Sequence, residues 1–185
     1  RIKGDTEIYF RDISTSHKHI QFIIRTVIGK DRPGLVETLS DTVYQNHGNW
    51  LASSLSKLAG QFAGILQIEV ADQYIPVLSQ SLSKLDGLQI HIVEDDSKAV
   101  PVTTLHNLTV TGNDRLGIVK EVTAKLNQLG ININKLKTDT QSAPNWGYPI
   151  FSANFQLELP SELALETVQD ELEQLSDDLN IDVDD

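Results

Sequence analysis

The stretch Val27-Ile28-Gly29-Lys30-Asp31-Arg32-Pro33-Gly34-Leu35-Val36 recurs 83 positions later as Val110-Thr111-Gly112-Asn113-Asp114-Arg115-Leu116-Gly117-Ile118-Val119. Six of the ten positions are identical. Each copy ends a run typical of a β-strand and begins a run typical of a helix, so the shared Gly-x-Asp-Arg-x-Gly is predicted to be a turn. Its glycines permit a positive φ or a close backbone approach, and its aspartate suits a helix N-terminus. The repeat therefore predicts two domains that share one fold.

The residues around both turns follow the same order of elements. Strands are expected over residues 20–28, 49–58, 62–70 and 88–93, and again over 105–111, 131–140, 151–159 and 179–183. Amphipathic helices fill the first and third intervals of each copy. A βαββαβ order with alternating strands predicts the α+β class, in two ferredoxin-like domains with four-stranded antiparallel sheets and both helices on one face.

The helical spacing of apolar residues predicts which side chains point into each core. The expected inward residues are Leu35, Val36, Leu39 and Val43 after the first turn, and Val119, Val122 and Leu126 after the second. Pro160-Ser161 is expected to cap the last helix. The second copy also has a seven-residue insertion within residues 141–149, which contains Trp146 and Tyr148. Loops extended in this way are usually functional or interfacial.

The repeat also sets the expected domain boundaries. The first domain is predicted over residues 20–94 and the second over residues 105–185, joined by a short polar linker at 95–104. Residues 1–19 are interpreted as an N-terminal extension, either added or truncated, and no inference is based on them. The linker is too short to let the two halves move far apart.

The formal net charge of −11 limits the kinds of partner. Such a surface repels phosphate backbones, so direct nucleic-acid binding is not expected. No apolar run approaches the ~20 residues that span a bilayer, so no membrane partner is predicted. The chain has no cysteine, which excludes disulfides and thiolate chemistry and favours a cytoplasmic location.

Catalytic signals are missing from the sequence. It contains no nucleophile elbow, no P-loop and no His-x-x-x-His or Glu-x-x-His pair. His47, His91 and His106 have no carboxylate at a spacing that suggests a relay, so we interpret them as structural. The acidic residues between Glu171 and Asp178 are interpreted as a solvated helix face. We therefore predict no catalytic residue, no metal site and no cofactor.

The repeated turn is the better candidate for function. The first-turn amides of a helix have no intrahelical partner and lie at its positive end, which suits a carboxylate. Asp31 or Asp114 could receive a nearby ammonium group, so the turn would match a free α-amino acid. In the alternative reading, the aspartates only cap the helices and Arg32 and Arg115 form surface ion pairs. The residues alone leave these two interpretations open.

Both turns resemble the β1–α1 junction of the ACT domain, a small-ligand sensing module. The resemblance rests on Gly-x-Asp-Arg-Pro-Gly-Leu-Val, with His47-Gly48-Asn49 and Gly130-Ile131-Asn132 at the second strands. Leu58-Ala59-Gly60-Gln61-Phe62-Ala63-Gly64, Ser142-Ala143-Pro144 and the tandem arrangement are similar to the glycine cleavage system transcriptional repressor family. The resemblance implies that amino acids bind at an interface between paired domains, at Asp31, Arg32, Gly34, Asn49, Asp114, Arg115, Gly117 and Asn132. Leu116 replaces the proline of the first turn, so the two turns are expected to differ in rigidity, which leaves open whether one or both bind.

The resemblance also implies a function. We expect a regulatory protein that is not an enzyme, that binds glycine or a similar small amino acid, and that contacts a DNA-binding activator protein rather than DNA. A homo-oligomer is expected, because each small sheet leaves a face and an edge uncovered. Two rival hypotheses are a non-sensing assembly module and the regulatory part of an enzyme such as formyltetrahydrofolate deformylase, which begins with a similar segment.

Overall fold

The structure is a computed structural model, which describes residues 19–93, 104–142 and 147–184. The chain divides into two compact units, one within residues 1–97 and the other within residues 98–185. The predicted N-terminal extension and linker, except for the last residue of each, lie outside the described residues, and so does Trp146 of the predicted insertion.

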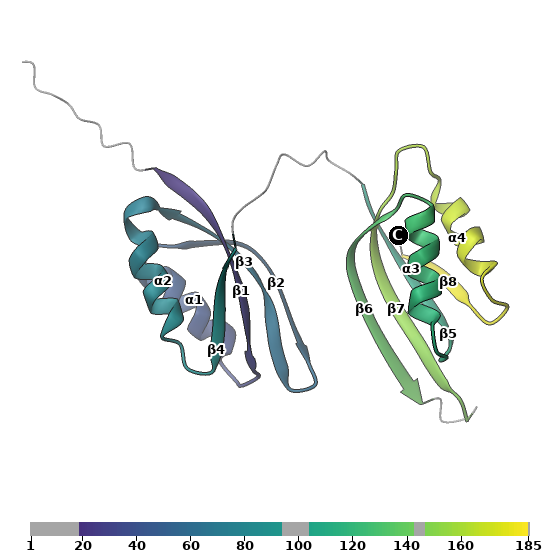
Figure 1. Cartoon of the computed structure of the whole chain (residues 1–185), viewed down its shortest axis with the longest axis horizontal. Coiled ribbons are helices and arrows are strands. Elements are labelled where there is room, and N and C mark those ends of the chain that lie inside the picture. Colours follow the sequence, from purple (N-terminus) through teal and green to yellow (C-terminus); the bar gives the residue numbers. More distant parts are fainter. Residues whose placement is uncertain (1–18, 94–103, 143–146, 185) are drawn as a thin grey trace, which may run out of the picture. The chain divides into compact units, whose positions relative to one another are not determined.

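The first unit is a four-stranded antiparallel sheet with two α-helices on one face (Figure 1). Its elements in chain order are β1 (Ile20–Lys30), α1 (Leu35–Gln45), β2 (Asn49–Leu58), β3 (Gln61–Ala71), the 3₁₀ helix η1 (Asp72–Tyr74), α2 (Ile75–Ser83) and β4 (Leu88–Val93). The strand order is β2-β3-β1-β4, so β2 and β4 are the edges.

The second unit repeats this architecture (Figure 1). Its elements are β5 (Leu105–Asn113), α3 (Ile118–Gln128), β6 (Asn132–Ser142), β7 (Pro149–Glu158), α4 (Leu165–Glu173) and β8 (Asn180–Asp184). The strand order is β6-β7-β5-β8, with β6 and β8 at the edges. The predicted α+β class and the duplicated βαββαβ fold are therefore confirmed.

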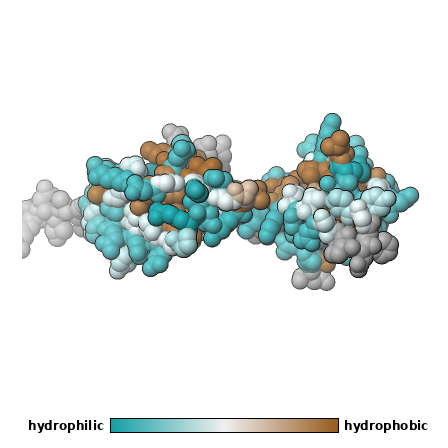
Figure 2. Space-filling view, turned by 90° about the horizontal axis from the view of Figure 1, so that it is seen from below, coloured by the Kyte–Doolittle hydropathy of each residue, from teal (hydrophilic) through white to brown (hydrophobic). Residues whose placement is uncertain are grey.

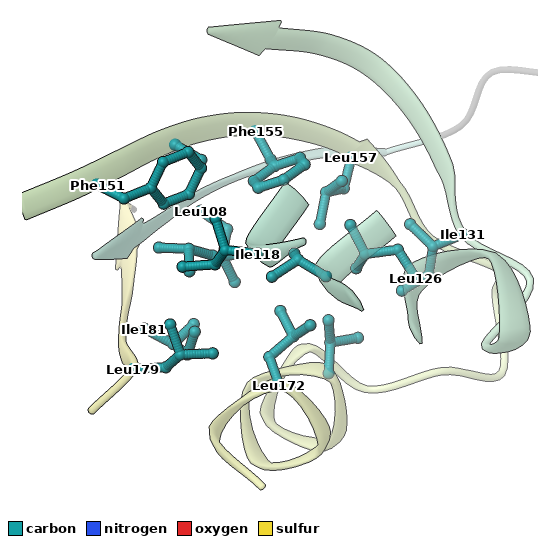
Figure 3. Close-up of a cluster of buried hydrophobic side chains, with 14 of the residues drawn as sticks. Leu108, Ile118, Leu126, Ile131, Phe151, Phe155, Leu157, Leu172, Leu179 and Ile181 are labelled. Atoms are coloured by element: carbon teal, nitrogen blue, oxygen red, sulfur yellow. The ribbon is translucent and has the colours of Figure 1, made fainter. Parts of the chain in front are cut away.

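Each core lies between the sheet and its helices. In the second unit, Leu108 and Phe155 of the sheet face Leu126 of α3 and Leu172 of α4 (Figure 3). The first unit has a corresponding cluster around Leu66 of β3, which is fully buried. Alternate residues of each strand enter the core, as the sequence pattern predicts.

Two residues predicted to face the core point outward instead. Val36 is 45% exposed and Val119 is 39% exposed, whereas Leu35 and Ile118 beside them are buried. Residues four apart share a helix face, and each of these two buried residues begins the inward row of its helix at that spacing. The predicted inward faces of α1 and α3 were therefore wrong by one residue at their first turns.

The predicted cap at Pro160-Ser161 is also wrong. Helix α4 begins after Ala164, which makes no side-chain capping hydrogen bond. The Leu163 N–H donates to the Pro160 carbonyl at 3.0 Å, so a separate turn precedes the helix. The proline and serine belong to that turn, where a fixed φ is suitable.

Strand pairing takes up both ends of the predicted insertion. β6 continues to Ser142, which pairs with Pro149, and Gln141 pairs with Ile150. The Tyr148 side chain, just before β7, is 70% exposed. The insertion therefore lengthens the β6–β7 hairpin.

The two glycines of the repeated turn have different roles. A Cβ added at Gly29 would lie 2.1 Å from the Gly87 carbonyl oxygen, so this glycine lets the α2–β4 turn pack against β1. Gly34 has open space around it but a φ of 78°, in the left-handed region that favours glycine. Gly112 and Gly117 repeat these roles, with a φ of 84° at Gly117.

Alanine at these two glycines should therefore have unequal effects. Gly29→Ala should lower the free energy of unfolding by at least ~2 kcal/mol, because the new Cβ collides with backbone atoms. Gly34→Ala should cost only about 1 kcal/mol, from the left-handed backbone alone. Urea denaturation followed by circular dichroism measures both. Equal losses would contradict the assignment of roles.

A buried arginine interrupts the apolar core of the first unit. Arg25 is 4% exposed; its Nη1 donates to the Ile24 carbonyl at 2.9 Å and its Nη2 to Ser79 Oγ at 3.1 Å. Among the residues that the structure describes, no carboxylate lies within ion-pair distance of it. Burial lowers the pKa of Arg25 from its ordinary value. The second unit has Leu108 at the corresponding position of β5.

The substitution Arg25→Leu should stabilise the chain by about 1 kcal/mol, because it removes the desolvation cost of a buried charge. The converse change, Leu108→Arg, should destabilise the second unit by several-fold more. Thermal unfolding followed by circular dichroism measures both variants. A lower Tm for Arg25→Leu would mean that the hydrogen bonds of Arg25 outweigh its desolvation.

Candidate functional site

Each repeated turn is anchored to the end of its own sheet. The Asp31 N–H donates to the Gly60 carbonyl at 2.9 Å, and the Asp114 N–H donates to the Pro149 carbonyl at the same distance. These bonds continue the β1–β3 and β5–β7 ladders by one step past their last pairs. Both turns therefore start from the same place, next to the hairpin between the second and third strands.

The helix after each turn begins with a glycine. Gly34 and Gly117 are the N-cap residues of α1 and α3, and neither helix has a side-chain capping hydrogen bond. The hypothesis that Asp31 and Asp114 cap the helices is therefore wrong, because each lies three residues before the cap. The first-turn amides of both helices lack a capping side chain, at the end where the helix dipole favours an anion.

In the first unit the turn encloses a small cavity of about 130 Å³. The turn, the first residues of α1, Lys57 and the buried ring of Phe62 line it. The Asp31 Oδ1 atom is buried there and has no hydrogen-bond partner among the described residues. The Lys57 Nζ lies 3.3 Å from this oxygen, which is within ion-pair distance although the geometry is not that of a hydrogen bond. The cavity thus combines a carboxylate, an ammonium and a positive helix end.

The neighbouring Arg32 also lines this cavity, and its guanidinium bonds to a second turn. Its Nη2 donates to the Asp86 carbonyl at 3.2 Å, in the α2–β4 turn, and its side chain is exposed. Arg32 therefore ties the two turns of this end of the unit together. Its guanidinium has no carboxylate partner among the described residues.

In the second unit the same turn is arranged differently. Asp114 is exposed, and Thr140 occupies the position that corresponds to Lys57. Arg115 forms an ion pair with Glu121 of the first turn of α3. This contact raises the pKa of Arg115 and lowers the pKa of Glu121. Charged side chains of the chain itself therefore lie beside this helix N-terminus.

A carboxylate in the α4–β8 turn also holds the beginning of the repeated turn in the second unit. The Asn113 N–H donates to Asp178 Oδ2 at 3.0 Å, and the Ser176 hydroxyl donates to the other carboxylate oxygen. These two donors, the serine first, lower the pKa of Asp178 from its ordinary value of 3.8. The end of β5 is thus tied to the α4–β8 turn by a charged side chain.

The two predicted asparagines lie away from the turns of their own units. Asn49 donates to Glu69 Oε2 at 3.2 Å and Asn132 donates to Glu158 Oε2 at 3.1 Å. Both stand at the beginning of an edge strand, whereas Lys57 stands near its end, about 25 Å further along at 3.3 Å per residue. Within one unit, the structure therefore does not bring these asparagines to the aspartates and glycines of the turn.

One functional signal in the sequence was missed. Lys57 faces the turn because β2 and β1 run in the same direction, which brings their ends together on either side of β3. Its counterpart is a threonine, so comparison of the two copies could have identified it.

No group of His, Asp and Glu suited to a metal ion lies within the described parts of the chain. Each helix of those parts is too short or too polar to cross a membrane.

The ACT domain matches this chain twice, at residues 21–93 and 105–181. The crystal structure of an unknown protein from Galdieria sulphuraria is 30% identical to it, with a TM-score of 0.74; the match covers 90% of this chain and 98% of that one. The crystal structure of a candidate glycine cleavage system transcriptional repressor is 20% identical, with a TM-score of 0.64; that match covers 89% and 96%. No curated protein sequence matched the chain.

The chain therefore belongs to the ACT-domain family and carries the domain twice in tandem. The likeness to the repressor candidate extends over almost the whole of both chains, and at 20% identity it is a likeness of fold.

The contacts of Asp178 predict an acid-sensitive contribution to stability. A lowered pKa in the folded state stabilises the fold above the unfolded pKa, and this contribution is lost as the pH falls through the folded value. At pH 7, Asp178→Asn should cost about 0.5 kcal/mol, a small value because the group is partly exposed. The difference from wild type should shrink below about pH 4.

Urea denaturation at pH 7 and at pH 3 measures this difference. Asp177→Asn is the control, because it removes the same charge from an exposed neighbour without these contacts. A cost for Asp178→Asn that stays constant with pH would contradict the prediction.

Proposed function

We propose that this tandem ACT protein is an amino-acid-sensing regulator whose ligand binds at the β1–α1 turn of the first unit. The observation that carries the proposal is the buried Asp31 Oδ1, which has no hydrogen-bond partner among the described residues and lies beside the uncapped first turn of α1. The Lys57 ammonium, 3.3 Å away, offsets the charge of this oxygen, and a ligand ammonium would give it the hydrogen bond that it lacks. The amides of the helix start would receive the ligand carboxylate.

The size of the cavity favours a small ligand. A volume of about 130 Å³ suits an amino acid with little or no side chain, such as glycine. Lys57 supplies a second positive charge next to the carboxylate site, and Phe62 closes the cavity on the side of the core. The pattern of charges thus matches a zwitterion rather than a simple anion or cation.

The contacts of the second turn argue against an equal role for it. Arg115 is paired with Glu121, and Asp114 is exposed without a counterpart of Lys57. We therefore assign ligand binding to Asp31, Gly34 and Lys57 rather than to the corresponding residues of the second copy. Asp114, Arg115, Gly117 and Asn132 keep a structural role in this proposal.

We propose that Asn49 joins the site from a second copy of the chain. In an antiparallel pairing of two β2 strands, the beginning of one strand lies beside the end of the other, so Asn49 would approach the partner's turn. β2 is suited to such pairing, because it is ten residues long and Lys57, near its end, is its one charged residue. The corresponding edge β6 carries Lys135, Lys137 and Asp139, which discourage edge pairing.

Regulation requires a partner and a cytoplasmic location in this proposal. The net charge of −11 disfavours direct contact with DNA, and the fold likeness to a repressor candidate supports a role in transcription. We propose that the chain contacts a DNA-binding activator protein and that the amino acid changes this contact. The ligand would then have to bind one arrangement of the ACT domains better than another.

Isothermal titration calorimetry of the whole chain against the twenty amino acids tests ligand binding. Glycine or another small amino acid should release or absorb heat, and larger ones should not. Asp31→Asn should weaken binding by on the order of 10- to 100-fold, because a charge-assisted hydrogen bond is lost. The matched variant Asp114→Asn should bind as wild type does.

Two outcomes would contradict this proposal. The absence of heat with all twenty amino acids at millimolar concentration would favour the non-sensing assembly module. Equal losses in the two aspartate variants would mean that both turns bind. Circular dichroism of each variant checks that it is folded.

A further inference from the structure

The two units differ most on the sheet face that no helix covers. In the first unit this outer face carries a group of exposed apolar residues beside polar ones such as Gln67 and His91: Phe22 is 51% exposed, Ile28 44% and Ile65 51%. These residues alternate along their strands with buried ones that fill the core, so they belong to the opposite face. Apolar patches are visible on the surface in the space-filling view (Figure 2).

The second unit carries polar residues at most of the corresponding register positions, although Phe22 corresponds to the exposed Leu105. Ile24, Ile28, Ala63, Ile65 and Val93 of the first unit correspond to Asn107, Thr111, Ser152, Asn154 and Asp184 of the second. On the edge strands, Ala52 and Ser54 correspond to Lys135 and Lys137. The polar side chains also bond to one another across the strands, as when Thr109 Oγ1 donates to Asn154 Oδ1 at 2.8 Å.

The fold therefore does not require an apolar outer face. Both units have the same topology and helices on one side, and the second is complete with an outer face that is mainly polar apart from Leu105 and Ile150. A contiguous apolar patch on one unit then needs a separate explanation, and patches of this kind usually mark contact surfaces.

We propose that the outer sheet face of the first unit is the interface through which two copies of this chain associate, face to face. The sheet is about 19 Å wide across four strands at ~4.8 Å spacing and about 25 Å long over the shared register. A symmetric pair would bury on the order of 1,000 Å², which reaches the lower limit for a specific interface. Two such faces pack at ~10 Å separation.

The charges of this face are suited to self-association. Its charged side chains are Lys30, at the end of β1, and Glu69, which pairs with Phe22 near the beginning of that strand. If the β1 strands of the two copies run antiparallel, each Lys30 meets the partner's Glu69 end, which is a self-complementary arrangement. Elsewhere the face is neutral, so two chains with a net charge of −11 repel each other least along it.

The β2-edge pairing proposed for the ligand site uses a different surface, and the two contacts are compatible. The face contact buries apolar side chains between two sheets, whereas the edge contact joins strands within one sheet. The two proposals therefore fail separately in experiments. Loss of the face contact should leave amino-acid binding intact.

Sedimentation equilibrium of the whole chain tests the face contact. Ile65→Lys should halve the molar mass, because a buried charge opposes packing of the two faces. Asn154→Lys, at the same register position of the second unit, should leave the mass unchanged. Ile65 is half exposed, so the variant should remain folded, which circular dichroism checks.

Chemical crosslinking provides a second measurement that does not depend on disrupting the contact. The chain has no cysteine, and Thr26 stands at the centre of the face, between Ile65 and His91. Thr26→Cys should be joined to a second chain by a bis-maleimide of about 10 Å, the distance between packed sheets. Thr109→Cys, at the equivalent position of the second unit, should not be crosslinked.

The following results would overturn the proposal. In sedimentation, the wild-type protein could have the mass of a single chain, or Ile65→Lys could have the same mass as wild type. In crosslinking, Thr26→Cys and Thr109→Cys could be joined to a second chain equally well. A one-chain mass with Thr26→Cys protected from the reagent would mean that another segment of the same chain covers the face.

Discussion

Two helices can cover only one face of a four-stranded sheet, and this constraint determines what each unit must do with its other face. The central strand of each unit is the clearest case. Val27 and Val110 lie at equivalent positions and are buried under helices, while Thr26 and Thr109 beside them point to the opposite side. Apart from Arg25, where the second copy has Leu108, the helix-covered face is similar in both copies. The differences between the copies accumulate on the uncovered face and at its edges, where folding sets few requirements.

The same central strand positions the candidate site. The β1–β3 ladder ends at Lys30 and Gln61, and the next amide, that of Asp31, still bonds to the hairpin carbonyl of Gly60. The chain then needs only a short turn to reach the start of α1. A carboxylate is thus held at the end of the sheet, close to a positive helix end. The turn can serve as a binding site because strand pairing, rather than a cap, holds its aspartate.

Local features of this chain were predictable, and long-range ones were not. The motif predicted the element order and the two kinds of glycine role, because both follow from backbone geometry within a few residues. The prediction that Val36 and Val119 point inward was wrong because neighbouring residues of a helix point in different directions. An error of one residue is therefore enough to exchange a buried side chain for an exposed one. The cap expected at Pro160-Ser161 failed because a turn intervened before the helix.

The candidate site shows the same division. The family resemblance grouped Asn49 with the turn. Within its own unit, however, Asn49 lies at the end of β2 that is far from the turn. Lys57 became visible only when strand pairing brought it to Asp31. The burial of Arg25 also depends on packing, because a strand position does not tell which face meets a helix. The contrast between Ile65 and Asn154 was present in the sequence but required the register to be aligned.

Three independent differences between the copies point in one direction. The first copy has a buried carboxylate oxygen with no hydrogen-bond donor among the described residues, an edge strand with one charge, and a group of exposed apolar residues on its outer face. The second copy has polar groups at each of the corresponding places. They are the Arg115–Glu121 ion pair at the turn, the lysines of β6, and the hydrogen-bonded polar side chains of the outer face. Drift alone would not be expected to keep all three unsatisfied features in one unit, because each lowers solubility or stability. These differences support the proposal that the first unit, rather than the second, makes the contacts with other molecules.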